Sequence, residues 1–327
     1  MTRRQFNVLG DRLIAHSSPA EADLAELRTA LAAYQEVLER VKVHLRDLGF
    51  APTPRVKTTP TMTDKLRRTP GMDLSRMQDI AGARITVRDL AAQDRAKNRI
   101  SEFYTGQGCR WRAIDRREDP RFGYRAMHLV VHVDDLPVEI QIRTELQDSW
   151  AQIVERLGDR WGRGIRYGQD PQDPESIVRS GGTVMTRREL LALLMRLSDL
   201  IWAVEQNRRG LDTNNQGLAD TDSGWRDLKP TASPELRVSE VAPELAGLPE
   251  ALAAVLTDRS EQLDTEAREL LATPFDDLTV AQLSRMHEIA MGLLRGAVSA
   301  MTDTLVATEQ RARDILQLIA GAADEGA

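Results

Sequence analysis

The spacing of apolar residues predicts a long helix near the start of the chain. Between residues 18 and 48, apolar side chains recur at alternating intervals of three and four, which places them on one face of a helix. They are Leu24, Leu27, Leu31, Tyr34, Leu38, Val41, Leu45 and Leu48. Ser18, Pro19 and Glu21 are typical of a helix start, with Ser18 as the cap. Gly49 is typical of the residue that follows a helix end. A single apolar face implies that this helix packs on the next domain or on a partner helix.

From about residue 52 to residue 167 the pattern alternates between the periods of strands and helices. Segments 83–89, 110–118, 127–133 and 138–143 read as strands, and 91–106 reads as a helix. Pro137 must lie where its missing N–H does not interrupt a ladder. Thr144 and Gln147 have the spacing of a capping box at the start of another helix. These elements predict an α/β fold, a mixed β-sheet flanked by helices, with helical N- and C-terminal extensions.

Beyond residue 167 the pattern becomes helical and then polar. Residues 187–210 carry apolar positions at heptad spacing, and 248–272 and 277–320 read as two further helices. The intervening stretch, around 210–247, is rich in Pro, Gly and acidic residues and is predicted to be an exposed, partly disordered linker. We therefore expect three regions: a helical segment 1–50, a domain 51–167 and a helical region 168–327. The helical regions offer surfaces for packing or for homo-oligomerisation.

The composition indicates the cellular compartment in which the protein functions. The chain has 327 residues and one cysteine, Cys109, so no internal disulfide can form. Asp11 and Arg12 interrupt what would be the apolar core of a signal peptide. No stretch approaches the roughly 18 uninterrupted apolar residues of a membrane helix. We therefore expect a cytoplasmic protein without a membrane partner.

Charge is distributed unevenly along the chain. The whole chain has a net charge of −6, yet residues 51–167 contain 22 Lys and Arg against 16 Asp and Glu. A basic middle within an acidic protein is typical of a domain that handles phosphates, although a solvated surface of mixed charge gives the same count.

The last predicted strand of the middle domain has a polar side that needs a function. Val138, Ile140 and Ile142 alternate with Glu139, Gln141 and Arg143, so one face of the strand is apolar and the other is polar. Further polar groups gather before it in the sequence, in "RVKTTPTMTDKLRR" (55–68), "QDIAGARI" (78–85) and "GYRAMH" (123–128). Taken singly, each is typical of a solvated helix face or of a turn.

Together and in this order, the motifs resemble the synthetase domain of the RelA/SpoT family. The matching stretches are "RVK…T…K", "DIAGARI", "GYRAMH" and "VEIQIRT…WA", within residues 55–167. The resemblance implies a cytoplasmic, magnesium-dependent enzyme that transfers pyrophosphate from ATP to the 3′-hydroxyl of GDP or GTP. The products would be the alarmone (p)ppGpp and AMP.

The resemblance also implies roles for individual residues. It assigns Asp79 and Glu139 to magnesium binding and catalysis. It assigns the ATP site to Arg55, Lys57, Thr61, Lys65 and Arg84, with the two arginines around adenine. It assigns the acceptor site to Arg121, Tyr124, His128, Gln141, Arg143 and Asp148, with the tyrosine stacked on guanine.

Elementary chemistry agrees with these roles. Pyrophosphoryl transfer develops charge on phosphate oxygens, which a cation held by carboxylates and a ring of Lys and Arg can stabilise. Magnesium is commonly held by one or two carboxylates together with substrate phosphates. Arginine stacks on purines better than lysine because its guanidinium is planar. Glu139 could also accept the hydroxyl proton as a general base.

The sequence departs from the family on the acceptor side. Phe122 stands where the family has a polar residue, Ala126 where serine is common, and Asp148 where asparagine is common in small synthetases. Arg121 keeps a positive charge in the first of these stretches. Two alternatives therefore stay open. In the first, the acceptor is the 3′ CCA end of tRNA, as in toxic relatives; in the second, the chain is a catalytically silent nucleotide-binding regulator.

Overall fold

The computed structural model describes residues 1–16, 18–180, 183–228, 234, 248–274 and 277–325. Their contacts divide into two compact units, one formed by Met1–Glu205 with Arg311–Ala327 and the other by Gln206–Gln310. This division differs from the three regions 1–50, 51–167 and 168–327 expected from the sequence, because one long helix and the last helix of the chain each contribute to both units.

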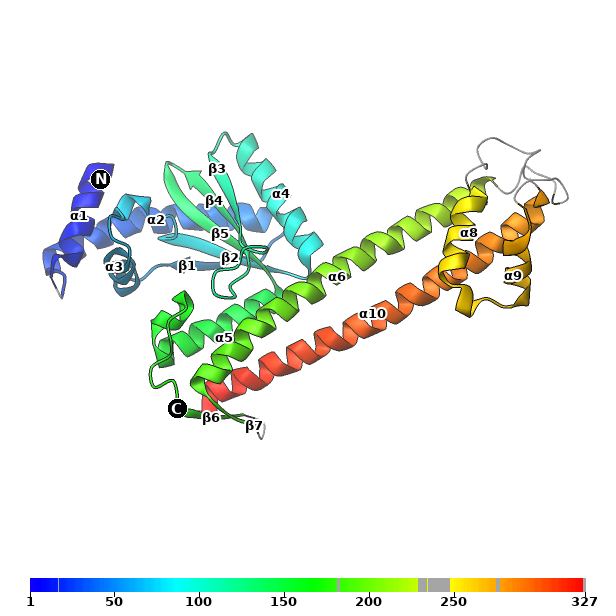
Figure 1. Cartoon of the computed structure of the whole chain (residues 1–327). Helices are drawn as coiled ribbons and strands as arrows, with labels where there is room; N and C mark the ends of the chain where they lie inside the picture. The colour runs from blue at the N-terminus through cyan, green and yellow to red at the C-terminus, as the bar shows by residue number, and fades with distance from the viewer. Residues whose placement is uncertain (17, 181–182, 229–233, 235–247, 275–276, 326–327) are drawn as a thin grey trace. The chain divides into compact units, whose positions relative to one another are not determined.

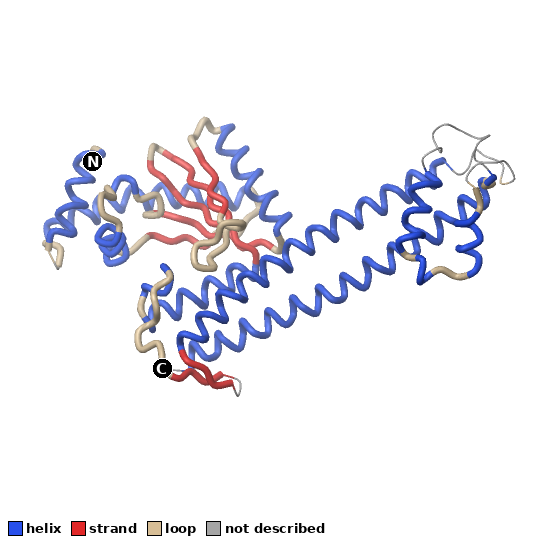
Figure 2. Tube along the Cα trace, viewed as in Figure 1, coloured by secondary structure: helices blue, strands red, loops and turns tan. Residues whose placement is uncertain are grey.

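A five-stranded mixed sheet forms the centre of the first unit (Figures 1 and 2). Its strands are β1 (Thr53–Val56), β2 (Ala81–Val87), β3 (Trp111–Asp115), β4 (Met127–Val133) and β5 (Leu136–Thr144). Their order is β1-β2-β5-β4-β3, with β2 and β5 parallel and the other pairs antiparallel. The mixed sheet flanked by helices, with helical regions before and after it, confirms the predicted fold class.

The apolar side of the sheet forms the main hydrophobic core. The helices α2 (Glu21–Asp47) and α4 (Leu90–Gly106) cover this side, and α1 (Arg3–Ala15) and α3 (Thr59–Arg68) add to the same core. Val138, Ile140 and Ile142 are completely buried in it, as the alternation in β5 predicted. The opposite side of β5, with Glu139 and Gln141, is therefore free to serve a site.

The start of α2 corrects one prediction. The helix begins at Glu21, and its N-cap residue Ala20 makes no side-chain capping bond, so Ser18 is not the cap. Arg12 on α1 binds Asp23 at 2.7 Å, which ties the first turn of α2 to α1. The residues between the two helices must serve as their connection, and α2 therefore starts later than the local capping signal suggests.

The capping box at the start of α5 (Glu145–Trp161) is confirmed. Thr144 accepts a hydrogen bond from the backbone N–H of Gln147, and the Gln147 side chain accepts one from the Thr144 N–H. Pro137 lies one residue before the pairing of β5 with β2 begins at Val138, so its missing N–H interrupts no ladder on that side. A short hairpin of β6 (Ile177–Ser180) and β7 (Thr183–Thr186) was not predicted.

The helix α6 (Arg187–Leu228) is longer than predicted. Residues 210–228, expected to be exposed linker, form its C-terminal part, while 229–233 and 235–247 lie outside the described residues. A helix extends easily from a well-packed turn, because each added residue needs no new nucleation. The buried positions of α6 before residue 206, such as Leu194 and Ile201, provide that packed beginning.

The second unit is helical. The predicted helix 248–272 is interrupted, because Asp264 caps a new helix by accepting a hydrogen bond from Ala267 N at 2.9 Å. It thus forms α8 (Leu248–Asp258) and α9 (Thr265–Ala272), which pack with the first part of α10 (Val280–Glu325) in a separate apolar cluster.

Part of α10 has the length and composition of a membrane-crossing helix. Among the residues that the structure describes, Val280–Gly321 is the stretch that meets this test, with a mean hydropathy of 1.2 and 11% of its most apolar window buried. A core helix of a soluble protein passes the same test, so the feature is weak evidence of a membrane. The expectation of a cytoplasmic protein stays a prediction.

Candidate functional site

The polar side of the sheet collects residues from four strands. In the register of the sheet, Gln141 on β5 pairs with Arg84 on β2 and with His128 on β4. One step along, Glu139 pairs with Gly82, which pairs with Arg55 on β1. Residues that are directly paired lie on the same side of a sheet. The fold therefore brings these predicted ATP-side and acceptor-side residues to one surface.

Asp79 is held between two lysines immediately before β2. Lys57 and Lys65 bind its two carboxylate oxygens, at 2.5 and 2.8 Å. Burial alone would raise the pKa of Asp79, but the two ammonium groups outweigh it and lower the pKa to about 2. Burial also lowers the pKa of Lys57, and Asp79 offsets part of this effect. Asp79 is therefore ionised and surrounded by positive charge.

Glu139 lies close enough to Asp79 for their charges to interact. Its carboxylate accepts a hydrogen bond from Gln141 at 2.8 Å and lies 3.1 Å from Nδ1 of His128. Burial and the charge of Asp79 raise the pKa of Glu139, yet the bonds from His128 and Gln141 prevail and the net shift is downward. Asp79, Glu139 and Lys65 line one open cleft of about 1190 Å³. We call Lys57, Lys65, Asp79 and Glu139 the carboxylate end of the site.

The tyrosine end consists of Tyr124, His128, Arg143 and Asp148. The Tyr124 hydroxyl lies 2.9 Å from Nε2 of His128, and Arg143 donates to the same hydroxyl at 3.2 Å. Tyr124 is half-buried; it packs against the apolar cluster of α5 and α6, and the guanidinium carbon of Arg143 lies 5.1 Å from the centre of its ring. Burial raises the pKa of Tyr124, and the neighbouring guanidinium of Arg143 acts in the opposite direction. A neutral phenol beside an arginine suits stacking on a purine.

The two ends are joined through His128. If Nδ1 of the imidazole donates to Glu139, Nε2 is left to accept from the Tyr124 hydroxyl, which in turn accepts from Arg143. This assignment satisfies each of these polar atoms with one arrangement of hydrogens. A chain of hydrogen bonds therefore runs from Arg143 to Glu139.

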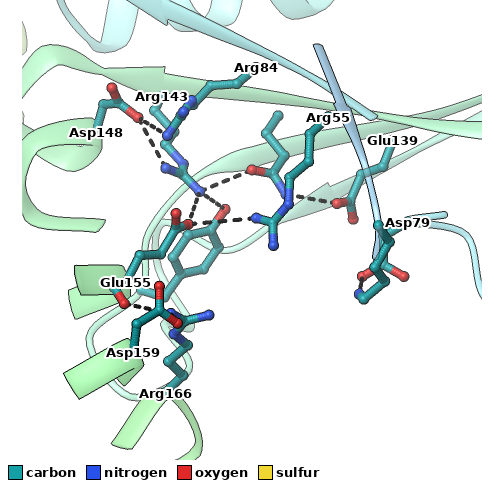
Figure 3. Close-up of polar contacts among 12 residues, drawn as sticks. Arg55, Asp79, Arg84, Glu139, Arg143, Asp148, Glu155, Asp159 and Arg166 are labelled. Atoms are coloured by element: carbon teal, nitrogen blue, oxygen red, sulfur yellow. Dashed lines mark hydrogen bonds and ion pairs between the residues drawn. The ribbon is translucent and has the colours of Figure 1, made fainter. Parts of the chain in front are cut away.

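Asp148 binds one arginine from each of the two predicted substrate sites. Figure 3 shows Arg84 and Arg143 directed at its carboxylate, where both bind Oδ1, at 3.1 and 3.0 Å. Gln152 donates to Oδ2 at 2.6 Å, and Asp148 is only 8% exposed. The predicted contact of Asp148 with guanine stays a prediction, since its oxygens are engaged within the protein in this structure.

One residue of the site was missed by sequence reasoning. Glu155 on α5 lies 3.9 Å from Arg55 and 3.7 Å from Arg143. It follows Asp148 and Gln152 at helical spacing, so the three side chains lie on one polar face of α5. That spacing was the available signal, because the opposite face of this helix is apolar.

Two predicted residues lie apart from these contacts. Thr61, in α3, exchanges a hydrogen bond with Thr58 at 2.8 Å. Arg121 is exposed and pairs through its backbone with Tyr124. Between them in the loop, Phe122 is 50% exposed and adopts a left-handed backbone conformation with φ of 51°. Their roles toward a nucleotide stay predictions.

The donor set fits a magnesium ion in chemical type. No group of three or more His, Cys, Asp or Glu residues that could hold a metal occurs within the described ranges. Asp79 and Glu139 supply two ionised carboxylates, and magnesium accepts such a pair when phosphates and waters complete its shell. A cation between them would also remove the repulsion that Asp79 exerts on the ionised Glu139.

A family model identifies the central segment. Residues 54–157 match the model described as "Region found in RelA / SpoT proteins". This match confirms the family resemblance for the segment that contains most of the site.

Curated relatives match over a similar length. Uncharacterized protein Rv1366 of Mycobacterium tuberculosis and uncharacterized protein Mb1401 of Mycobacterium bovis are each 43% identical over 122 residues. The match covers 37% of this chain and 44% of each relative, so the chain spans less than half the length of these relatives.

Solved structures resemble the chain at low similarity. Small alarmone synthetase 1 from Bacillus subtilis is 23% identical, covering 59% of this chain and 98% of that protein, with a TM-score of 0.44. The same protein bound to its product pppGpp is 22% identical, with 58% of this chain and 98% of that protein covered and a TM-score of 0.45. A GTP pyrophosphokinase family protein from Streptococcus pneumoniae is 22% identical, with 59% of this chain and 95% of that protein covered and a TM-score of 0.44. The function proposed below therefore rests on the residues of this chain and on the matched segment.

Proposed function

We propose that this chain, whose residues 54–157 are a RelA/SpoT region, is an ATP-dependent pyrophosphokinase that acts on GDP or GTP. The observation that carries the proposal is the closeness of Asp79 and Glu139, sixty positions apart in sequence, which line one cleft and whose charges interact. Lys57 and Lys65 bind Asp79, and Tyr124 connects to Glu139 through His128. A silent nucleotide-binding protein would have no need of two ionised carboxylates at this place.

The proposed reaction forms and breaks one P–O bond. The 3′-oxygen of the guanosine nucleotide attacks the β-phosphorus of ATP, and the bond from that phosphorus to the α,β-bridging oxygen breaks. AMP leaves with the bridging oxygen, and pyrophosphate remains on the acceptor. The hydroxyl proton passes to Glu139, whose lowered pKa makes it a weak base. A weak base is sufficient if the transition state is loose, because catalysis then depends mainly on positioning and charge.

Asp79 and Glu139 would hold a magnesium ion, which when bound neutralises charge on the phosphate oxygens. Lys57 and Lys65, which bind Asp79 in this structure, would bind those oxygens. Arg55 and Arg84 would hold adenine, and Tyr124 would stack on guanine. The cytoplasm, with its ATP and magnesium, is the compartment that suits this reaction.

The proposed function is tested by measuring which acceptor receives the label from ATP. Purified full-length protein is incubated with magnesium and γ-labelled ATP, and GDP, GTP or tRNA is added singly. We expect label on the guanosine nucleotide and one AMP for each label transferred. If only tRNA becomes labelled, the acceptor is the CCA end of tRNA and not a guanosine nucleotide. If no acceptor causes AMP release, the chain is a nucleotide-binding protein without this activity.

A further inference from the structure

One stretch of α6, from Ser198 to Glu205, contacts the direct neighbours of the tyrosine-end residues. The stretch lies in the first compact unit and outside the segment matched by the family model. Ser198, Asp199 and Glu205 make these contacts through polar side chains. None of these residues belongs to the site described above.

The first two contacts hold both sides of Tyr124. Ser198 donates a hydrogen bond to the carbonyl of Gly123 at 2.5 Å, and Asp199 binds the guanidinium of Arg125 at 2.7 Å. Gly123 has a positive φ of 76°, and an added Cβ would lie 2.7 Å from the Trp150 ring. The backbone on either side of Tyr124 is thus fixed by α6 and by close packing on α5.

The third contact holds the neighbours of Arg143 and Asp148. The carboxylate of Glu205 accepts a hydrogen bond from the hydroxyl of Thr144, the residue after Arg143. Its other oxygen accepts from the side chain of Gln147 at 2.9 Å, the residue before Asp148. Glu205 therefore binds both residues of the α5 capping box and holds the turn that carries the Arg143–Asp148 ion pair.

Packing alone does not explain a glutamate at position 205, because burying its carboxylate costs free energy. It is 8% exposed, and both of its partners are almost completely buried. A buried carboxylate is unfavourable unless hydrogen bonds compensate, and an apolar residue could fill the same space. Gln93 on α4 extends the network by donating to Gln147 at 3.0 Å and to the carbonyl of Ile142 at 2.7 Å.

We propose that α6 positions the acceptor-binding side of the site, with Glu205 as its central positioning residue. The inference rests on the proposed function in taking Tyr124 and Arg143 as the guanine-nucleotide side. Residues that touch a ligand need a rigid second layer, because a small displacement of the first layer weakens binding strongly. The phosphates of a nucleotide at the carboxylate end depend less on this layer, since Lys57, which directly follows β1, and Lys65 in α3 are held by Asp79. The layer reaches the predicted ATP side through Arg84, which shares Asp148 with Arg143.

The test measures binding of one nucleotide at a time, so it does not require turnover. Dissociation constants of GDP and of ATP are determined by equilibrium dialysis for the full-length wild type, Glu205→Ala and Glu205→Gln. Glu205→Ala leaves two buried donors without an acceptor, and we expect GDP binding to weaken roughly tenfold while ATP binding changes less than about twofold. Glu205→Gln keeps one acceptor oxygen and should fall between wild type and Ala.

Two further variants make the test independent of folding. Asp199→Asn changes a side chain that is 72% exposed, so the fold should tolerate it, and it should also weaken GDP binding selectively. The matched control is Glu145→Ala, which removes an exposed carboxylate from the first turn of the same helix α5, where it binds Arg313 at 3.1 Å. The control should leave both dissociation constants unchanged. Thermal unfolding gives the folded fraction of each variant at the assay temperature.

The outcomes separate the inference from the proposed function. Selective loss of GDP binding supports the inference, even if the wild type releases no AMP and the proposed activity fails. Equal loss for GDP and ATP, or loss in proportion to the folded fraction, means that Glu205 has only a structural role and overturns the inference. A wild type that binds ATP but no GDP also overturns it.

Discussion

The carboxylate end and the tyrosine end of the site are built in different ways. At the carboxylate end, Lys57 and Lys65 bind Asp79 directly through ion pairs, within the segment that matches the family. At the tyrosine end, the positions of Tyr124 and Arg143 depend on α5 and on α6, and α6 lies outside that segment. The difference teaches that one short segment can contain the charged groups of the proposed reaction while the binding surface beside them relies on later parts of the chain.

The largest effect should come from the carboxylates themselves. Asp79→Asn or Glu139→Gln removes one of the two charged ligands for a cation, and we expect AMP release to fall by about 10³-fold or more. GDP binding, measured without magnesium, should change little in Asp79→Asn, because this variant leaves the contacts of His128 with Glu139 and Tyr124 intact. Asp134→Asn is the matched control, because Asp134 lines the same cleft and contacts Arg40 instead. Retained activity in either carboxylate variant would refute the assignment.

A backbone change can disturb the carboxylate end without removing a charge. A Cβ at Gly82 would lie 2.9 Å from the carbonyl oxygen of Glu139, so Gly82→Ala must push β2 away from β5. We expect the free energy of unfolding to drop by about 1–3 kcal/mol and AMP release to drop with it. Gly106→Ala, at a position with no atom within 4 Å, should leave both unchanged. Equal stability of the two variants in urea unfolding would contradict the close approach.

Acidification should weaken the carboxylate end first. The pKa of Asp79 is lowered from 3.8 to about 2 in the folded chain, so its ionised form favours folding. This contribution is complete above pH 4 and is lost as the pH falls toward 2, with a size on the order of 2 kcal/mol. Free energies of unfolding of the wild type and Asp79→Asn, measured along a pH series, should therefore converge at low pH. A constant difference between them would show that the pKa of Asp79 is not lowered.

The smallest effect should come from the Tyr124 hydroxyl. Tyr124→Phe removes its bonds to His128 and Arg143 but keeps the ring, and we expect the KM for GDP to rise roughly threefold to tenfold. The KM for ATP should stay constant, as the tyrosine end would not contact it. Tyr167→Phe is the control, since it removes the hydroxyl of an exposed tyrosine and keeps the ring that packs under Arg68. A parallel rise in both KM values would mean that the two ends do not act separately.

The sequence predicted what depends on local patterns. The alternation of β5 placed Glu139 and Gln141 opposite the core, and the capping box placed the start of α5 at Thr144. The order of the motifs assigned Asp79 and Glu139 to a single site, and both line the same cleft.

Contacts between residues far apart in the sequence were not predicted. Glu205 follows Val204 at the edge of an apolar heptad face, where a charged residue reads as a solvated one, and its partners Thr144 and Gln147 are about sixty residues earlier. The strand β1 was also not predicted, and α1 was covered only by the general expectation of a helical segment 1–50, because short segments with exposed or mixed residues give no clear period. In both cases tertiary partners, and not local spacing, determine the structure.

The apolar face of α5 has a consequence for how the chain can be divided. Leu146, Trp150 and Leu157 on this face are covered by α6 and by residues 312–319 near the end of α10. The indole N–H of Trp150 donates to the carbonyl of Leu194 at 2.7 Å. A fragment cut near residue 157, where the family match ends, would expose this surface to water. Complete cover of α5 thus requires the two helical stretches that lie far beyond it in the sequence.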